Sequence, residues 1–376
     1  MPENASLLRT PLHAEHAALG AKLVPFAGYE MPVQYPTGIT AEHHAVRNAA
    51  GLFDVSHMGE FAVRGERALE FMQHVTTNDV SKLEPGQAQY STLLNHDGLL
   101  LDDLLVYRLA DHYMLVVNGS NKDKDFAWIS QWTGEFGVEL TDRTEEIALL
   151  ALQGPKAEEI LARLTAADLP SIRYYRFAEG EVDGVRGIIS RTGYTGEDGF
   201  ELYVAAADAA RLWRRILEAG RDDGLIPAGL GARDSLRLEM GYALYGNDLD
   251  EEHTPLEAGL GWVVKLDKGE FVGREALRRQ KEEGVRQRLV GFRLKERGFP
   301  RHGYSVVVAD QPSGVVTSGI VSPSLGEGVG MAYVRTEHAK PGTEVGIQIR
   351  SQTVPAEVVR PPFYTRGSVR VPGAGA

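Results

Sequence analysis

Apolar residues recur with helical spacing in three stretches of the chain. The clearest stretch runs from Asp208 to Glu218, and one face of this predicted helix collects Ala209, Leu212, Trp213, Ile216 and Leu217. Asp208 stands where a capping residue belongs, and Gly220 stands where a helix usually ends. Two further helices are predicted from Pro155 to Leu164 and over residues 11–23.

Period-two alternation and β-branched runs predict a set of short strands. Residues 90–94, 104–108 and 113–117 are typical of successive antiparallel strands joined by short turns. Residues 200–204 predict another strand, on which Glu201 faces away from the apolar side. Because helical and strand patterns do not alternate regularly, we expect an α+β fold with antiparallel sheets.

The length of the chain indicates more than one domain. Single hydrophobic cores stop growing at about 250–300 residues, and this chain has 376. After about residue 285 the composition shifts to Val, Gly, Pro and Ser, with turn residues every 8–12 positions. This shift predicts a separate all-β domain at the C-terminal end.

Composition excludes several classes of protein. Apolar residues make up 43% and charged residues 24%, which is ordinary for a globular protein. A net charge of −12 argues against general nucleic-acid binding. The absence of cysteine excludes disulfides, thiolate metal sites and a Cys nucleophile. With neither a signal-like start nor a run of about 20 apolar residues, we expect a cytoplasmic protein with no membrane partner.

Familiar short motifs do not fit. The glycines of 229–231 and 326–330 lack the context of a dinucleotide-binding turn, and no phosphate-binding GxxxxGK[ST] motif is present. The pairs His13/His16 and His43/His44 have no further ligands at metal spacing, so solvated or capping histidines are expected and no metal site.

Two adjacent carboxylates, Asp102 and Asp103, interrupt an otherwise apolar strand pattern. Neighbours on a strand face opposite sides, so one of them faces the core or a cleft. A carboxylate among apolar groups has its charged form disfavoured unless a donor or cation meets it, as in tuned acid–base groups. The pattern alone leaves open a surface acid at a turn. It also leaves open whether segments 191–201 and 229–239 are only a turn and a capped helix start.

Five longer motifs carry a family resemblance. They are FDVSHMGE (53–60), GLLLDDLLVY (98–107), GYTGEDGFE (193–201), GLGARDSLRLEMG (229–241) and LYGNDLDEEHTPLEAGL (244–260). In this order they resemble the aminomethyltransferase (T-protein) family of the glycine cleavage system, and the resemblance extends from about Leu7 to Arg370.

The resemblance implies a three-domain, cloverleaf-like arrangement. Its parts would be a discontinuous folate-binding domain of residues 1–50 and 141–245, an inserted antiparallel α+β domain of residues 51–140 and 246–284, and a C-terminal β-barrel domain of residues 285–376. Tetrahydrofolate would bind in the central opening. The implied partner is the lipoylated H-protein, and the implied reaction moves its aminomethyl carbon to tetrahydrofolate with release of ammonia. A monomer is assumed.

The resemblance also assigns roles to residues. Asp102 matches the catalytic carboxylate near the reactive folate nitrogens, while Asp103 is expected to face away from them. Glu201 matches the acid that pairs with the donor edge of the pterin, and Arg233 matches an arginine for the folate carboxylates or the site acids. The remaining cofactor-binding residues implied are Tyr90, Tyr194 and Trp262 as aromatic walls, Asn118 as a donor, and Arg366 near the folate tail. The three aromatic residues are equally compatible with core packing.

Other functions use the same scaffold, so the fold does not decide between them. A folate-dependent N- or S-demethylase is one alternative, although such relatives often depart from GYTGEDG. A non-catalytic folate-binding protein is another. The folate-binding proteins linked to tRNA modification carry a cysteine-containing motif, which this chain lacks.

Overall fold

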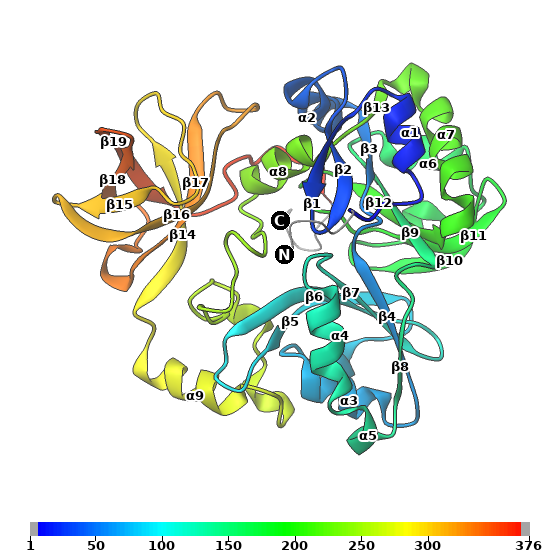
Figure 1. The fold of residues 1–376 in the computed structure, drawn as a ribbon, viewed down its shortest axis with the longest axis horizontal. Coiled ribbons are helices and arrows are strands. Elements are labelled where there is room, and N and C mark those ends of the chain that lie inside the picture. Colours follow the sequence, from blue (N-terminus) through cyan, green and yellow to red (C-terminus); the bar gives the residue numbers. More distant parts are fainter. Residues whose placement is uncertain (1–6, 370–376) are drawn as a thin grey trace.

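Three lobes surround a common centre in the computed structural model, which describes residues 7–369 (Figure 1). Each lobe is built on its own sheet, and two of these sheets are open while the third closes into a barrel. The α+β class with antiparallel sheets and a C-terminal barrel is thereby confirmed. In the described part of the chain, every helix is too short or too polar to cross a membrane.

The first lobe contains a six-stranded sheet. Its strands, in spatial order, are β10 (Phe177–Val182), β11 (Val185–Ser190), β12 (Gly199–Ala205), β9 (Ile147–Gln153), β3 (Ala50–Asp54) and β13 (Leu225–Pro227). All neighbours pair antiparallel except β3 and β13. The elements beside this sheet are the hairpin β1 (Lys22–Phe26) and β2 (Tyr29–Gln34) with the helices α1 (His13–Ala18), α2 (Ile39–Asn48), α6 (Ala157–Ala162), α7 (Ala209–Ala219) and α8 (Leu230–Glu239).

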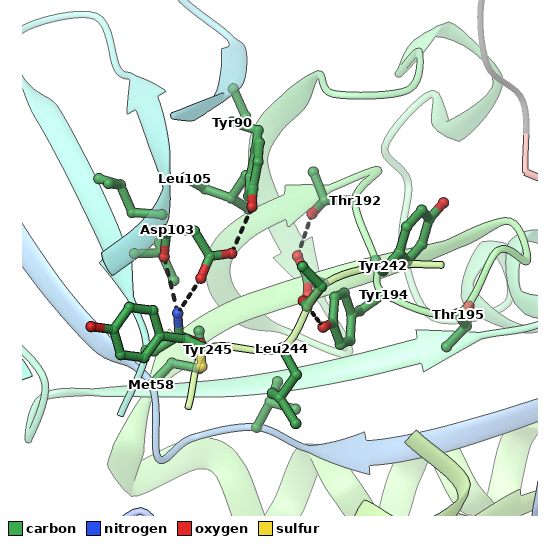
Figure 2. Close-up of a pocket in the computed structure, with 18 of the residues that line it drawn as sticks. Met58, Tyr90, Asp103, Leu105, Thr192, Tyr194, Thr195, Tyr242, Leu244 and Tyr245 are labelled. Carbon is green, nitrogen blue, oxygen red and sulfur yellow. Dashed lines mark hydrogen bonds between the residues drawn. The ribbon is translucent and has the colours of Figure 1, made fainter. Parts of the chain in front are cut away.

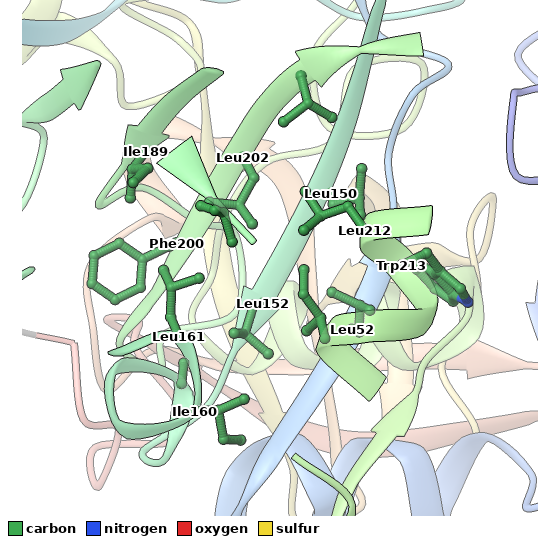
Figure 3. Close-up of a cluster of buried hydrophobic side chains, with 14 of the residues drawn as sticks. Leu52, Leu150, Leu152, Ile160, Leu161, Ile189, Phe200, Leu202, Leu212 and Trp213 are labelled. Carbon is green, nitrogen blue, oxygen red and sulfur yellow. The ribbon is translucent and has the colours of Figure 1, made fainter. Parts of the chain in front are cut away.

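One face of this sheet forms the largest apolar core. Leu150 and Leu202 on the strands meet Leu212 and Trp213 of α7, all of them buried (Figure 3). Burying each large apolar side chain contributes about 1.5–3 kcal/mol. The amphipathic face predicted for 208–218 is therefore what holds α7 on the sheet.

The second lobe contains a five-stranded antiparallel sheet. Its strands, in spatial order, are β5 (Gln87–Leu94), β6 (Leu100–Arg108), β7 (Tyr113–Val117), β4 (Gly59–Arg64) and β8 (Glu139–Asp142). The helices of this lobe are α3 (Ala68–Val75), α4 (Lys122–Ser130) and α5 (Thr133–Phe136). The three successive strands predicted from alternation are β5, β6 and β7, so that prediction is confirmed.

The third lobe is a closed barrel. Its strands, in order around the barrel, are β14 (Gln287–Leu294), β17 (Gly328–Arg335), β16 (Gln311–Val321), β15 (Ser305–Val308), β18 (Glu344–Ile349) and β19 (Gln352–Val359), and β19 pairs again with β14. Helix α9 (Arg274–Glu283) precedes the barrel, and its Leu277 packs with Leu94 and Leu100 of the second lobe.

Several local predictions need correction. The helix expected over residues 11–23 ends at Ala18, because the chain turns at Gly20, where φ is +70°, into strand β1. The Asp208 side chain makes no capping hydrogen bond, although α7 does begin beside it. The histidines of the two pairs are not all solvated: His16 is buried against Asp54, and His43 is buried between two serine hydroxyls.

The predicted domain boundaries cut through two strands. The boundary after residue 50 falls inside β3, which belongs to the first sheet, and the boundary after residue 140 falls inside β8, which pairs with β4 in the second. The sheet to which a strand belongs is set by its pairing with a distant segment, β9 for β3 and β4 for β8, and a local sequence pattern carries no information about that partner.

Helix α8 connects the lobes through buried charges. Arg237 donates to Asp248 Oδ2 at 2.6 Å and to Ser318 Oγ of barrel strand β16 at 2.8 Å. Glu239 accepts a hydrogen bond from Arg47 of α2 at 2.8 Å and from Ser324, just after β16, at 2.8 Å. The barrel is therefore held to the first lobe by fully paired buried ions.

The glycines that begin α8 are explained by close packing. A Cβ at Gly229 would lie 2.6 Å from the Val33 carbonyl, and one at Gly231 would lie 2.5 Å from the Ile39 side chain. The clash at Gly229 is with backbone, which cannot move aside, so a glycine there lets the start of the helix lie directly against β2; at Gly231 the Ile39 side chain would have to shift. This sequence, which does not fit a phosphate-binding motif, has a packing role.

We predict that Arg237→Ala destabilises the protein strongly. The Asp248 carboxylate has no exposed surface and would lose its cation, a loss that costs about 3–5 kcal/mol. The midpoint of denaturant unfolding measures this change. Arg215→Ala is the control, because Arg215 pairs with Glu218 in solvent, and its midpoint should not move. Equal falls in both variants would contradict the role given to α8.

Candidate active site

A cavity of about 780 Å³ lies where the three lobes meet. Ala151 of the first sheet, Tyr90 and Asp103 of the second, and Leu289 and Met331 of the barrel all line it. Its size falls in the range of small-molecule sites, which often lie between domains. The cavity exists only because the lobes are held in this arrangement.

The carboxylate that faces the cavity is Asp103, not Asp102. Asp103 lines the cavity, whereas the side chain of Asp102 is fully buried behind β6. Strand alternation was the right argument, because the two side chains do face opposite sides. Alternation left open which acid faces the site, because both faces of this strand are covered by apolar residues. The choice of Asp102 came from the family resemblance, and the cavity lining places Asp103 there instead.

Two donors hold the Asp103 carboxyl. The Tyr90 hydroxyl donates to Oδ2 at 2.8 Å, and Asn118 Nδ2 donates to Oδ1 at 2.9 Å (Figure 2). Burial and the neighbouring Asp102 charge raise the pKa of Asp103 to about 7, although both donors act in the opposite direction. A carboxyl with this pKa exchanges protons readily near neutral pH.

Asn118 bridges the two acids. Its backbone N–H donates to Asp102 Oδ2 at 3.0 Å, and its side-chain Nδ2 donates to Asp102 Oδ1 at 2.8 Å as well as to Asp103. Asn118 also lines the cavity. Its side-chain nitrogen is therefore committed to the two acids and is not free to act as the donor to a cofactor that the resemblance implied.

A second acidic group lies across the cavity on β12. Thr192 donates a hydrogen bond to Glu201, and burial raises the pKa of this carboxyl while the hydrogen bond and the Arg233 charge lower it (Figure 2). The Arg233 guanidinium stacks 4.5 Å above the centre of the Tyr194 ring. Arg233, Glu201 and Tyr194 all line the cavity, so three of the predicted residues are brought together.

Aromatic rings form two walls of the cavity. Tyr90 and Trp262 stack with centroids 5.8 Å apart at 18°, and Trp262 is 60% exposed. Tyr194 and Tyr242 stack at 5.7 Å and 26°. A large exposed indole next to a cavity is available to cover a flat ligand. The structure therefore brings all three predicted aromatic residues to the site.

Arg366 is not brought into the cavity. Its side chain is exposed and lies over the Tyr364 ring at 5.5 Å, and it is absent from the cavity lining. Tyr364 also stacks with Arg47, which anchors this closing segment to the first lobe. The expected contact of Arg366 with a folate tail thus has no support within the cavity itself.

Comparison with known proteins assigns the chain to a family. The family described as "GCVT N-terminal domain" matches residues 12–268, and the one described as "Glycine cleavage T-protein C-terminal barrel domain" matches residues 287–365. The chain belongs to the glycine cleavage T-protein family.

Relatives of the T-protein family match along nearly the whole chain. An aminomethyltransferase of Halothermothrix orenii is 52% identical and covers 94% of this chain and 99% of its own length. One from Rubrobacter xylanophilus is 54% identical, covering 96% and 95%. The crystal structure of the glycine cleavage system aminomethyltransferase T from Bartonella henselae is 37% identical, has a TM-score of 0.90, and covers 97% of this chain and 99% of that one.

Some residues of this T-protein family site were missed from sequence. Tyr174, Tyr175 and Tyr242 line the cavity, and Tyr175 has a left-handed backbone with φ of +60°. Tyr174 and Tyr175 lie in the connection just before β10, and Tyr242 lies just after α8, so all three stand outside helices and strands, and nothing in their local sequence pattern singles them out. No group of three or more His, Asp or Glu within residues 7–369 is arranged to hold a metal ion.

We predict that Tyr90→Phe raises the pKa of Asp103 by about one unit. The change keeps the ring stacked on Trp262 but removes the hydroxyl that donates to the charged carboxyl, an interaction of about 1–1.5 kcal/mol. NMR titration of ¹³C-labelled aspartate carboxyls measures it. Tyr304→Phe, in the barrel lobe, should leave the Asp103 titration unchanged. A downward shift in Tyr90→Phe would show that the hydroxyl does not stabilise the carboxylate.

Proposed function

We propose that this chain transfers the aminomethyl-derived one-carbon unit from the lipoyl arm of H-protein to tetrahydrofolate, releasing ammonia and forming 5,10-methylenetetrahydrofolate. The observation that supports this proposal most directly is Asp103, a carboxyl with a pKa of about 7 on the wall of a central cavity. Membership of the T-protein family and the curated relatives named aminomethyltransferase support the same reaction.

Glu201 is the proposed partner of the pterin ring. A carboxylate that accepts two parallel N–H bonds matches the donor edge of an aminopyrimidinone, and such charge-assisted pairs are strong. Burial raises the pKa of Glu201, and the Thr192 hydrogen bond and the Arg233 charge both act against this rise and favour the ionised form. Tyr194 and Tyr242 would then pack against the flat ring system.

Asp103 takes the role that sequence resemblance gave to Asp102. Formation of the methylene bridge removes two N–H protons from tetrahydrofolate, and one becomes part of the ammonia while the other ends on the released dihydrolipoyl sulfur. A carboxyl held near neutrality can accept a proton from one group and return it to another. Asp103 faces the cavity where the folate nitrogens would lie, and Tyr90 and Asn118 fix its orientation.

The decisive assay combines purified protein, tetrahydrofolate and aminomethyl-loaded H-protein. Equal amounts of methylenetetrahydrofolate and ammonia support the proposal. Folate binding without transfer would contradict it, and methylated amines and sulfonium compounds then test the demethylase alternative.

We predict that Asp103→Asn lowers kcat by about 10²–10⁴-fold, the usual contribution of a general acid–base group. The dissociation constant for tetrahydrofolate should change much less. In the unaltered protein, kcat should fall as the pH drops below about 7, because Asp103 is then protonated and accepts no further proton. Asp97→Asn, at an exposed turn before β6, is the matched control and should keep full activity. Equal losses of turnover and affinity would reduce Asp103 to a binding residue.

We predict that Glu201→Gln acts mainly on binding. The neutral amide presents one donor where the pterin also presents donors, so the dissociation constant for tetrahydrofolate should rise by about 10–100-fold, corresponding to about 1.5–3 kcal/mol. Fluorescence or calorimetric titration measures this constant. Glu179→Gln, exposed on β10 of the same sheet, serves as the control. An unchanged affinity in Glu201→Gln would remove Glu201 from the ligand site.

A further inference from the structure

A third carboxyl, that of Asp125, lies directly behind the acidic pair of β6. Asp125 of α4 and Asp102 both have no exposed surface, and their carboxyl groups lie within hydrogen-bonding reach of each other. Asp125 follows Asn121 by one helical turn, so the two side chains project from the same side of α4. Asn121 also reaches Asp102, and its Nδ2 donates to Oδ1 at 2.7 Å.

The hydrogen bonds around the two carboxyls are unequal. Asp102 accepts three, two from Asn118 and one from Asn121. Neither oxygen of Asp125 accepts a hydrogen bond from any group within residues 7–369. An ionised carboxylate buried without donors and beside another carboxylate is strongly disfavoured. The donors around Asp102 are those of a carboxylate, whereas the surroundings of Asp125 are those of a neutral acid.

The charged and titratable groups around Asp125 favour the neutral form. Burial first, and then the charges of Asp102 and Asp103 on β6, raise the pKa of Asp125 to about 11, and the Lys124 charge lowers it only in part. Lys124 Nζ is directed elsewhere, to the Leu101 carbonyl at 2.8 Å and to Glu251 at 2.7 Å. Tyr245 lies nearby, and burial together with the charges of Glu251, Asp102 and Asp125 raises its pKa, so it carries no charge that would favour an ionised Asp125.

We propose that Asp125 is a positioning residue, which stays protonated and donates its proton as a hydrogen bond to the Asp102 carboxylate. Asp102 is thereby kept as an ionised acceptor for Asn118, and Asn118 in turn holds Asp103 toward the cavity. The proposal rests on the transfer function given above to Asp103.

The consequence for the site is that only one negative charge stands behind Asn118. Were Asp125 ionised as well, its charge would raise the pKa of Asp103 further and leave more of that acid protonated at neutral pH. If Asp102 lost the hydrogen bond from Asp125, its ionised form would be less stable. The side-chain amide of Asn118 would then lose the charged acceptor that orients it.

Two substitutions of Asp125 test whether it acts as a neutral hydrogen-bond donor or as a charged acid. Asp125→Asn keeps a neutral N–H for Asp102, so kcat should stay within about twofold and the acid limb of the pH profile should stay in place. Asp125→Ala removes the donor, and kcat should fall about tenfold with a smaller change in KM for tetrahydrofolate. Asp123→Asn makes the same change at an exposed position of α4 and should alter nothing.

Infrared spectroscopy of the full chain labelled with ¹³C-carboxyl aspartate tests the proton directly and needs no turnover. At pH 9 Asp103 is ionised, so a protonated aspartate band should remain in the unaltered protein and disappear in Asp125→Asn. Absence of the band would overturn the proposal, as would an acid limb displaced to lower pH in Asp125→Asn. Because the band is read without substrate, it stays decisive if the chain fails to transfer or Asp125→Ala fails to fold.

Discussion

The arrangement of the lobes depends on charges buried along helix α8. Arg237 and Glu239 are both nearly without exposed surface. Arg237 pairs with Asp248 and Glu239 with Arg47 of the first lobe, and both are bonded to serines of the barrel lobe. A buried ion that loses a partner costs several kcal/mol, so intermediate orientations of the barrel are penalised. The network therefore selects one orientation of the lobes, in addition to any stability it contributes.

The same helix carries the chemistry of the cavity. Arg233 lies one turn before Arg237 and faces Glu201 and Tyr194, so the cavity wall and the contact with the barrel belong to one rigid element. The glycines at the start of α8 set how closely this helix approaches β2. Fold, lobe arrangement and binding site are thus linked through ten residues.

The protonation states of the acids near the cavity depend on the hydrogen-bond donors around each carboxyl. Three carboxyls follow one another in space from the cavity into the second lobe: Asp103, then Asp102, then Asp125. Asn118 bonds to both Asp103 and Asp102, and Asn121 bonds to Asp102. Asp102 and Asp125 have no exposed surface and Asp103 is half-buried. Asp102 and Asp103 accept hydrogen bonds from neighbouring donors and Asp125 accepts none from the described residues, which favours the ionised form of the first two and the neutral form of Asp125. The side-chain amides of Asn118 and Asn121 donate hydrogen bonds to these acids without adding charge, so several carboxyls can lie close together.

The amphipathic face of α7, the strands β5 to β7 and the all-β end of the chain could be predicted before the fold was known, because each depends on periodicity or composition within one segment. The long motifs of the sequence also named Glu201, Arg233 and Tyr90, which the structure gathers around one cavity. Only the tertiary structure decided that Asp103 rather than Asp102 faces that cavity, and that Arg366 does not. Alternation along β6 requires Asp102 and Asp103 to face opposite sides, but both faces are covered, so it does not say which one faces the site. Helix α4 packs behind the sheet on the Asp102 side, which leaves the Asp103 side to the cavity.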